Sequence, residues 1–241
     1  MRAISIIYRR EVGAYLRSPY GWIIAAIVLL VVGILFQGYA LGGEQLSAIV
    51  LERYFYFASL MPLFGGVLLS FRLLSEERQN HSMVLLNTSP VRDSEIVIGK
   101  FLAALTFLAV MLLLSIYMPI LIKVNGKITT AQVVVGYFGL LLIGSTTLAI
   151  GLFASALTRQ QLIAAVTAAA MVLVMCFIHL LASKADPPVK DALDQIDLWW
   201  VHYQYGFMKG ILNLKDVVYY LAATYFFLVL SIKTLEAKRW Q

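Results

Sequence analysis

The residues with the clearest chemical character lie together between positions 72 and 100. Charged side chains, including the acidic pair Glu76-Glu77 and Arg78, are followed closely by an apolar run at Met83–Leu86. Charges beside exposed apolar residues are suited to docking onto another protein. A solvated connector is the alternative interpretation, but a connector would not need the apolar run. After a Ser-Pro pair, a new helix is expected to begin around Arg92–Glu95.

The sequence lacks the residue patterns of common enzymes. It has no Ser/His/Asp set, no HExxH helix and no paired carboxylates within an apolar run. Gly99-Lys100 and Gly126-Lys127 lack the upstream glycine and the following Ser or Thr of a phosphate-binding loop, so the chain is not expected to hydrolyse ATP by that route. The apolar runs also hold no interior Asp, Glu or Lys of the kind that ion-coupled carriers use. Any transport would therefore draw its energy from another chain.

Composition indicates that the chain is a membrane protein. Of the 241 residues, 61% are hydrophobic and 13% are charged, whereas a soluble domain carries about 25% charged residues. Six apolar runs approach the roughly 20 residues that a helix needs to cross the hydrocarbon core. Because they do not alternate as barrel strands do, we expect an all-α polytopic fold with six transmembrane helices in one domain, residues 1–241. The runs are Tyr20–Ala40, Phe55–Phe71, Phe101–Ile122, Val133–Leu157, Leu162–Leu181 and Val217–Ile232.

The run that starts at residue 20 is longer than the 7–15 apolar residues of a signal peptide, so we expect it to be retained. The second and sixth runs are short, and they are expected to extend into the residues that flank them.

The net charge of +6 falls on one side of the expected topology. With the N-terminus in the cytoplasm, the inside segments hold twelve Lys and Arg against six Asp and Glu, and the outside segments hold seven against seven. This distribution follows the positive-inside rule. Both termini and residues 72–100 are therefore expected in the cytoplasm, and residues 182–216 outside. Binding of nucleic acid is not needed to explain the basic charge.

Residues 3–18 are expected to form an amphipathic helix in the membrane interface. Their apolar side chains recur at helical spacing, and four arginines gather on the opposite face, toward the lipid headgroups. Glu11 is the exception, because helical projection places its carboxylate on the apolar face, where an unpaired charge is costly. We expect Glu11 to form an ion pair with Arg72 or Arg78. The alternative is that it reaches water at the edge of the helix.

Residues 182–216 are expected to form short helices that dip into the outer leaflet. Asp186-Pro187-Pro188 breaks any longer helix, and apolar and aromatic residues then recur at roughly helical spacing through Trp199 and Trp200. Trp and Tyr favour the membrane interface. Simple interfacial packing is therefore favoured over direct contact with a substrate.

Residues 76–101 resemble the signature of ABC type-2 permeases. The family pattern runs from an acidic pair through Gly-Thr and a Leu-Leu-x-x-x-Pro segment to a Glu-Ile-Val-x-Gly-Lys-Phe start of the third span. Glu76-Glu77, residues 85–90 and residues 95–101 match it, whereas His81-Ser82 stands in place of the usual Gly-Thr. That departure concerns the geometry of the turn rather than the family. The short length and the C-terminal sequence are most similar to the gliding-motility-type branch.

The resemblance implies a permease subunit of an ATP-binding-cassette exporter in the bacterial inner membrane. It implies a dimer, with a second copy or a paralogue, working with two cytoplasmic ATPase subunits that bind ATP and Mg; no cofactor is expected in this chain. A cytoplasmic coupling helix after the second span would dock on the ATPase, with the N-terminal helix beside it. The alternative is a membrane scaffold that recruits a cytoplasmic partner without transport. The resemblance assigns ATPase coupling to Glu76, Glu77, Arg78, His81, Met83, Leu85 and Leu86.

Overall fold

The structure is a computed structural model that describes residues 2–41, 46–79 and 91–239. Every regular element in this part of the chain is a helix, which confirms the expected all-α fold. Six segments are long and apolar enough to cross a membrane, in agreement with the six expected spans, and the second and sixth extend well beyond their apolar runs. The segments are Pro19–Ala40, Ser47–Gln79, Asp93–Val124, Thr130–Leu157, Gln161–Ala182 and Leu214–Lys238.

The helices follow one another with few long connections. An N-terminal helix, α1 (Arg2–Arg17), precedes the first span, which consists of α2 (Pro19–Leu35) and the π-helical turn η1 (Phe36–Ala40). The second and third spans each contain several helices: α3 (Ser47–Ala58), α4 (Leu60–Ser70) and α5 (Arg72–Gln79), then α7 (Asp93–Leu114) and α8 (Tyr117–Asn125). The fourth to sixth spans are α9 (Thr130–Leu157), α10 (Gln161–Ala182) and α12 (Leu214–Arg239).

Side-chain caps determine where several of these helices begin. Ser18 accepts a hydrogen bond from the backbone N–H of Tyr20 at 3.3 Å, and Pro19 occupies the first helical position of α2. At the start of α7, a Glu95 carboxylate oxygen accepts from the backbone N–H of Arg92 at 3.1 Å. The helix start expected around Arg92–Glu95 is therefore confirmed.

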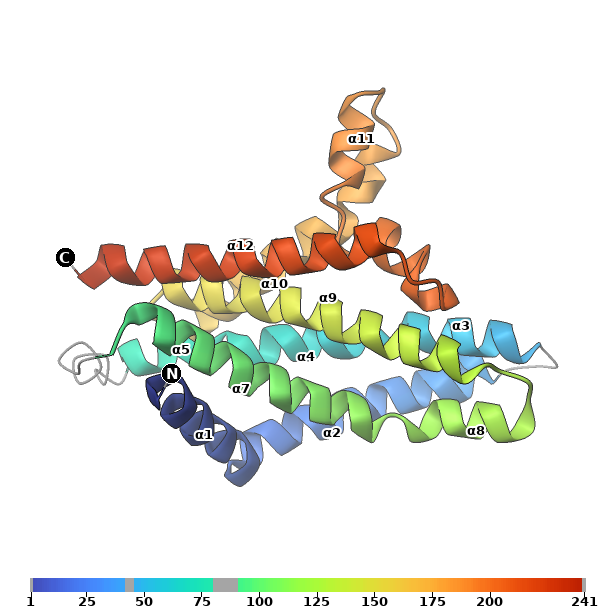
Figure 1. Cartoon of the computed structure of the whole chain (residues 1–241), viewed down its shortest axis with the longest axis horizontal. Helices are drawn as coiled ribbons and strands as arrows, with labels where there is room; N and C mark the ends of the chain where they lie inside the picture. The colour runs from blue at the N-terminus through green and yellow to red at the C-terminus, as the bar shows by residue number, and fades with distance from the viewer. Residues whose placement is uncertain (1, 42–45, 80–90, 240–241) are drawn as a thin grey trace.

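Helix α9 runs through the middle of the bundle and contacts α4, α7, α10 and α12 (Figure 1). Its small residues allow close approach of its neighbours: a Cβ atom at Gly151 would lie only 1.8 Å from Ser70 Oγ of α4. Near its end, Ser155 Oγ accepts hydrogen bonds from the backbone N–H groups of Leu74 and Ser75, at 3.0 and 2.9 Å. The first turn of α5 is thereby fixed to the central helix.

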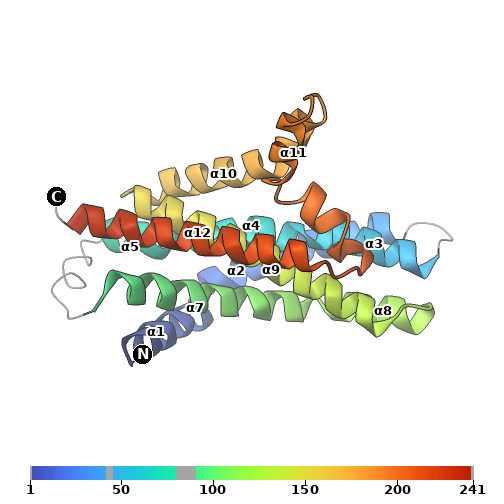
Figure 2. The ribbon, with the colours of Figure 1, turned by 45° about the horizontal axis from the view of Figure 1, so that its top comes forward.

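Both termini lie at the same end of the bundle, together with α5, the start of α7 and the α9–α10 hairpin (Figures 1 and 2). Helix α8 and the start of α3 lie at the opposite end. Helix α1 lies outside the bundle against α7.

The segment between α10 and α12 contains the expected short helices, α11 (Val189–Asp194), η2 (Trp200–Gln204) and η3 (Phe207–Lys209). Helix α11 projects from the bundle in both views (Figures 1 and 2). The following aromatic residues turn inward, because they find hydrogen-bond partners on the second span. Trp199 Nε1 donates to Ser59 Oγ at 2.9 Å, and the Tyr203 hydroxyl donates to the Phe55 carbonyl at 3.2 Å. These two side chains therefore pack against protein, where interfacial packing against lipid had been expected.

Candidate functional site

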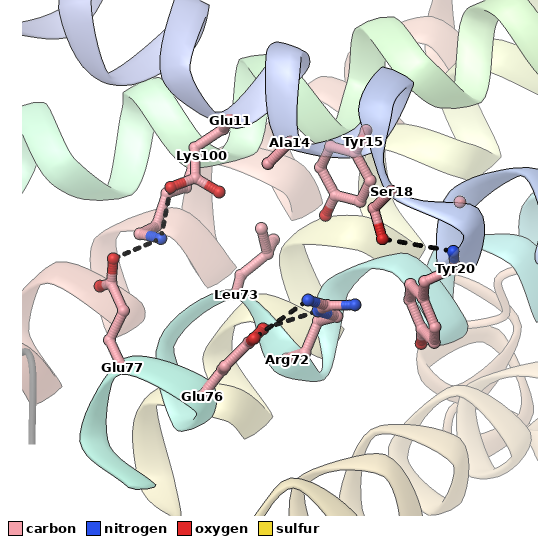
Figure 3. A pocket seen from close by; sticks show the side chains of 11 residues that line it. Glu11, Ala14, Tyr15, Ser18, Tyr20, Arg72, Leu73, Glu76, Glu77 and Lys100 are labelled. Carbon is pink, nitrogen blue, oxygen red and sulfur yellow. Dashed lines mark hydrogen bonds and ion pairs between the residues drawn. The ribbon is translucent and has the colours of Figure 1, made fainter. Parts of the chain in front are cut away.

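An ion-pair network lies where α1, α5 and α7 meet, at the end of the bundle that carries both termini (Figure 3). Its centre is Lys100, about two turns into α7, whose side chain is only 3% exposed. The Lys100 ammonium lies 3.0 Å from Glu11 Oε1 of α1 and 3.0 Å from Glu77 Oε1 of α5. One buried cation therefore links three helices that are far apart in the sequence.

Arg10 adds a second cation to this network. Its guanidinium lies 2.7 Å from Glu11 Oε1 and 2.9 Å from Glu77 Oε1, while its side chain stays 54% exposed. Each carboxylate thus has one buried and one exposed basic partner. A buried charge is tolerated only when such partners compensate for the lost hydration, and here two acids and two bases do so mutually.

A second ion pair holds the start of α2 to α5. The Arg72 guanidinium binds the Glu76 carboxylate through two contacts of 2.7 and 3.0 Å and lies 4.4 Å above the ring of Tyr20. The Tyr20 hydroxyl in turn donates to the Leu68 carbonyl of α4 at 2.8 Å. A polar pocket of about 260 Å³ lies between this pair and the Lys100 network, as Figure 3 shows.

The prediction that Glu11 forms an ion pair with Arg72 or Arg78 is wrong. Glu11 pairs with Lys100 and Arg10, while Arg72 is taken by Glu76 on its own helix and Arg78 donates to the Ala156 carbonyl of α9. The reason is the position of α1, which packs along α7 and so brings Glu11 beside Lys100. The sequence analysis treated Lys100 as part of a Gly-Lys pair and of the family pattern at residues 95–101, although a lone lysine at the start of an apolar run is itself a signal for a buried partner.

Two contacts fix α1 in this position. A Cβ atom at Gly99 of α7 would lie 2.9 Å from Ile7 Cγ2, so the absence of a side chain there allows α1 to approach closely. The buried Tyr15 donates its hydroxyl proton to the Leu69 carbonyl at 2.8 Å. The burial of Ile7 and Tyr15 confirms the amphipathic character predicted for residues 3–18.

Electrostatics keep Glu11 ionised. Burial raises the pKa of the Glu11 carboxyl, but the charges and hydrogen bonds of Lys100 and Arg10 outweigh it, and the net pKa lies below the ordinary value. Burial lowers the pKa of the Arg10 guanidinium, but its hydrogen bonds to Glu11 and Glu77 and their negative charges outweigh this effect, and the net pKa is raised. Glu11 and Arg10 are therefore both charged at neutral pH.

Glu11→Gln should lower stability at neutral pH by about 1.5–3 kcal/mol, because charge-assisted hydrogen bonds are replaced by neutral ones. The folded-state pKa is lowered, so the contribution is complete above the ordinary pKa of about 4.3 and is lost as pH falls through the lower folded value. Thermal unfolding in detergent should show a large difference from wild type at pH 7 that narrows below about pH 4. Glu236→Gln, in an exposed pair with Lys233, is the control and should change stability little.

The residues assigned to coupling fall into two groups. Glu76, Glu77 and Arg78 lie at the end of α5, and all three contact other parts of this chain. His81, Met83, Leu85 and Leu86 lie outside the residues that the structure describes. Helix α5 thus continues the second span and contacts α1, α7 and α9.

A second feature is an apolar groove between α4 and α10, with a volume of about 560 Å³. Trp199 and Trp200 line it together with side chains of both helices. Its lining is almost entirely hydrocarbon and aromatic, so it is suited to an alkyl chain or another apolar group. The residues on the two helices include Leu60, Phe64, Val67, Ala169, Val172 and Cys176.

Comparison with protein-family models gives a match that covers most of the chain. A family model described as "ABC-2 family transporter protein" matches residues 5–235, which is nearly the whole chain. No curated protein matches the sequence.

Proposed function

Because the chain belongs to the ABC-2 transporter family, we propose that it is the membrane-spanning permease subunit of an ATP-binding-cassette exporter. Its six apolar helical segments and its family identify a multi-pass membrane protein. A separate cytoplasmic ATPase would bind ATP and Mg and supply the energy, since the sequence has no phosphate-binding loop of its own.

The observation that carries the proposal is the network around Lys100. Helix α5 leads directly into residues 80–90, the segment that the family resemblance assigns to contact with the ATPase. A displacement of α5 moves Glu77, and Glu77 is bound to the same ammonium as Glu11. The starts of α7 and α1 would then move with α5. A displacement of α5 would thereby be transmitted to the first, second and third spans together.

This geometry changes the role proposed for the acidic pair. Glu77 is 14% exposed and faces Lys100, and Glu76 binds Arg72. Both carboxylates are engaged by cations of this chain, so we assign them to transmission within the permease. We then assign contact with the ATPase to the residues that follow α5.

The proposed orientation places both termini and residues 72–100 in the cytoplasm of a bacterial cell, with the chain in the inner membrane. The support is the excess of Lys and Arg in the segments at that end of the bundle. The working unit would be a dimer with a second copy or a paralogue. Within the family, the short length and C-terminal sequence favour the gliding-motility-type branch.

The groove between α4 and α10 favours an apolar or lipid-like substrate. Exposed apolar side chains, including Phe64, Val166 and Leu173, line it, and it offers few polar groups. A substrate with an alkyl or aromatic body could enter it from the bilayer without losing hydrogen bonds.

The proposal is tested by purifying the tagged chain from its native cells and reconstituting it in liposomes. An ATPase with a phosphate-binding loop should co-purify, and ATP should drive net movement of a fluorescent lipid probe between leaflets. Co-purification without ATP-dependent movement of lipid, drug or polymer probes would favour the alternative, a scaffold that recruits a cytoplasmic partner. Failure of any ATPase to co-purify would overturn the assignment as a permease subunit.

A further inference from the structure

Three basic side chains gather around the C-terminal end of α9. Arg78 of α5 and Lys238 of α12 both donate to the Ala156 carbonyl, and Lys238 also donates to the Leu157 carbonyl at 2.6 Å. Arg159 follows two residues later, and its positive charge acts on both of the others. The free carbonyl groups at a helix C-terminus attract cations, but they carry only about half a negative charge in total.

This cationic cluster has no acidic counterpart in the part of the chain that the structure describes. Arg10, Lys100, Arg72 and Lys233 each pair with a carboxylate, whereas Arg78, Arg159 and Lys238 pair with none. The neighbouring residues 80–90 contain no Asp or Glu. Three positive charges, brought together by α5, α12 and the turn between α9 and α10, therefore attract an anion from outside the chain.

A pocket of about 480 Å³ lies at the start of α10, and three of the residues that line it come just after Arg78 or Arg159 in the sequence. Three glutamines supply amide groups on one side: Gln79 directly follows Arg78, and Gln160 and Gln161 directly follow Arg159. Phe71, Leu162 and Ala165 supply an apolar side. A pocket with amide groups on one side and an apolar wall on the other suits the headgroup end of an amphiphile.

This pocket continues into the apolar groove between α4 and α10, because Ala165 lines both. On α10 the lining residues Gln161, Ala165, Ala169, Val172 and Cys176 follow one another at three- and four-residue steps, which places them on one face of the helix. From Ala165 to Phe177 the groove extends about 18 Å at 1.5 Å per residue. One leaflet of the hydrocarbon core is about 15 Å thick. The groove is thus long enough for an acyl chain of a single leaflet.

We infer that an anionic phospholipid binds here, from the leaflet on the side of both termini. Its phosphate would lie among Arg78, Arg159 and Lys238, with the glutamine amides beside it, and an acyl chain would lie in the groove toward Trp199 and Trp200. Phosphate oxygens match both guanidinium groups and the ammonium group. The cations exclude a neutral apolar molecule as the preferred occupant, and the apolar groove excludes a free phosphate.

The inference concerns binding and needs no ATP, so it is tested on the purified full-length chain. Native mass spectrometry should show that the chain retains phosphatidylglycerol at least about tenfold better than phosphatidylcholine with the same acyl chains. The double variant Arg78→Gln/Arg159→Gln keeps hydrogen-bond donors but removes two charges, and it should lose most of that preference. The matched control is Lys190→Gln/Lys215→Gln, which removes two charges from the segment expected on the other side of the membrane. This variant should keep the preference for phosphatidylglycerol.

A second arm tests the groove. Ala169→Phe places a large side chain in it and should weaken retention of both lipids, while the headgroup preference of the lipid that remains is unchanged. Equal retention of the two lipids by wild type, or an unchanged preference in the double arginine variant, would overturn the inference. If the double variant keeps its lipid preference but loses a co-purifying ATPase, the cations bind an acidic surface of that protein instead. Size-exclusion chromatography checks that each variant remains folded.

Discussion

Lys100→Met should abolish ATP-driven coupling and destabilise the chain by about 3–5 kcal/mol. The substitution removes the buried ammonium that lies 3.0 Å from both Glu11 and Glu77, and it leaves two largely buried carboxylates with only Arg10 between them. Loss of one member of a buried ionic group costs this much because the remaining charges stay without compensation. Thermal unfolding in detergent and ATPase stimulation in liposomes measure the two effects.

The control for this variant is Lys233→Met. Lys233 also pairs with a carboxylate, that of Glu236 at 2.7 Å, but the lysine side chain is 69% exposed. A solvated pair of this kind is worth about 0–1 kcal/mol. Near-equal losses of thermal stability and of ATPase stimulation in Lys100→Met and Lys233→Met would show that the Lys100 network has no special importance.

A triple variant separates stability from transmission. In Glu11→Gln/Glu77→Gln/Lys100→Met the buried charges are removed together, and replacing a whole buried ionic group by neutral residues of similar size is often close to neutral for stability. We expect thermal stability to recover and coupled ATPase activity to stay low. If both recover, the charges hold the fold together but do not transmit movement, and the proposed role of α5 loses its support.

The span count could be predicted from the sequence because it depends on local composition. The predicted boundaries of the spans were less accurate where polar residues interrupt an apolar run. The second span begins at Ser47, although Glu52 and Arg53 follow within two turns. The aromatic side chains of Tyr54 and Phe55 are fully buried in the protein, so the span includes this part of the helix despite the two charged residues. Hydropathy alone therefore started this span at Phe55.

The candidate site was predicted only in part, because its contacts depend on how helices pack. Helical projection identified Glu11 as a carboxylate that needs a partner, and that partner exists. Projection gives no information on which neighbour α1 lies against, so the choice of Arg72 or Arg78 was wrong. The decisive contact, Gly99 against Ile7, joins residues 92 positions apart and leaves no periodic pattern in the sequence. The same holds for the groove, which exists only once α4 and α10 lie together.

Gly99→Val should detach α1 from α7 and uncouple the permease while the six spans remain assembled. The new side chain would occupy space now filled by Ile7 and would also approach the Ile4 carbonyl, which lies 3.3 Å from the position of a Cβ atom. Overpacking of this kind costs about 1–3 kcal/mol. Because α1 lies outside the bundle, the least costly response is movement of that helix, which carries Glu11 away from Lys100.

Trypsin provides a direct measure of this movement, since Arg9 and Arg10 are exposed residues of α1. Cleavage within α1 should be at least several-fold faster in Gly99→Val than in wild type, and ATPase stimulation should fall about tenfold. Gly13→Val is the matched control: Gly13 lies on α1 itself, and no atom lies within 4 Å of its would-be Cβ. Valine also favours a helix more than glycine does, so this control should leave cleavage and coupling unchanged or slow the cleavage. Unchanged cleavage in Gly99→Val would mean that α1 accommodates the side chain in place. Fast cleavage with normal coupling would mean instead that the N-terminal helix takes no part in transmission.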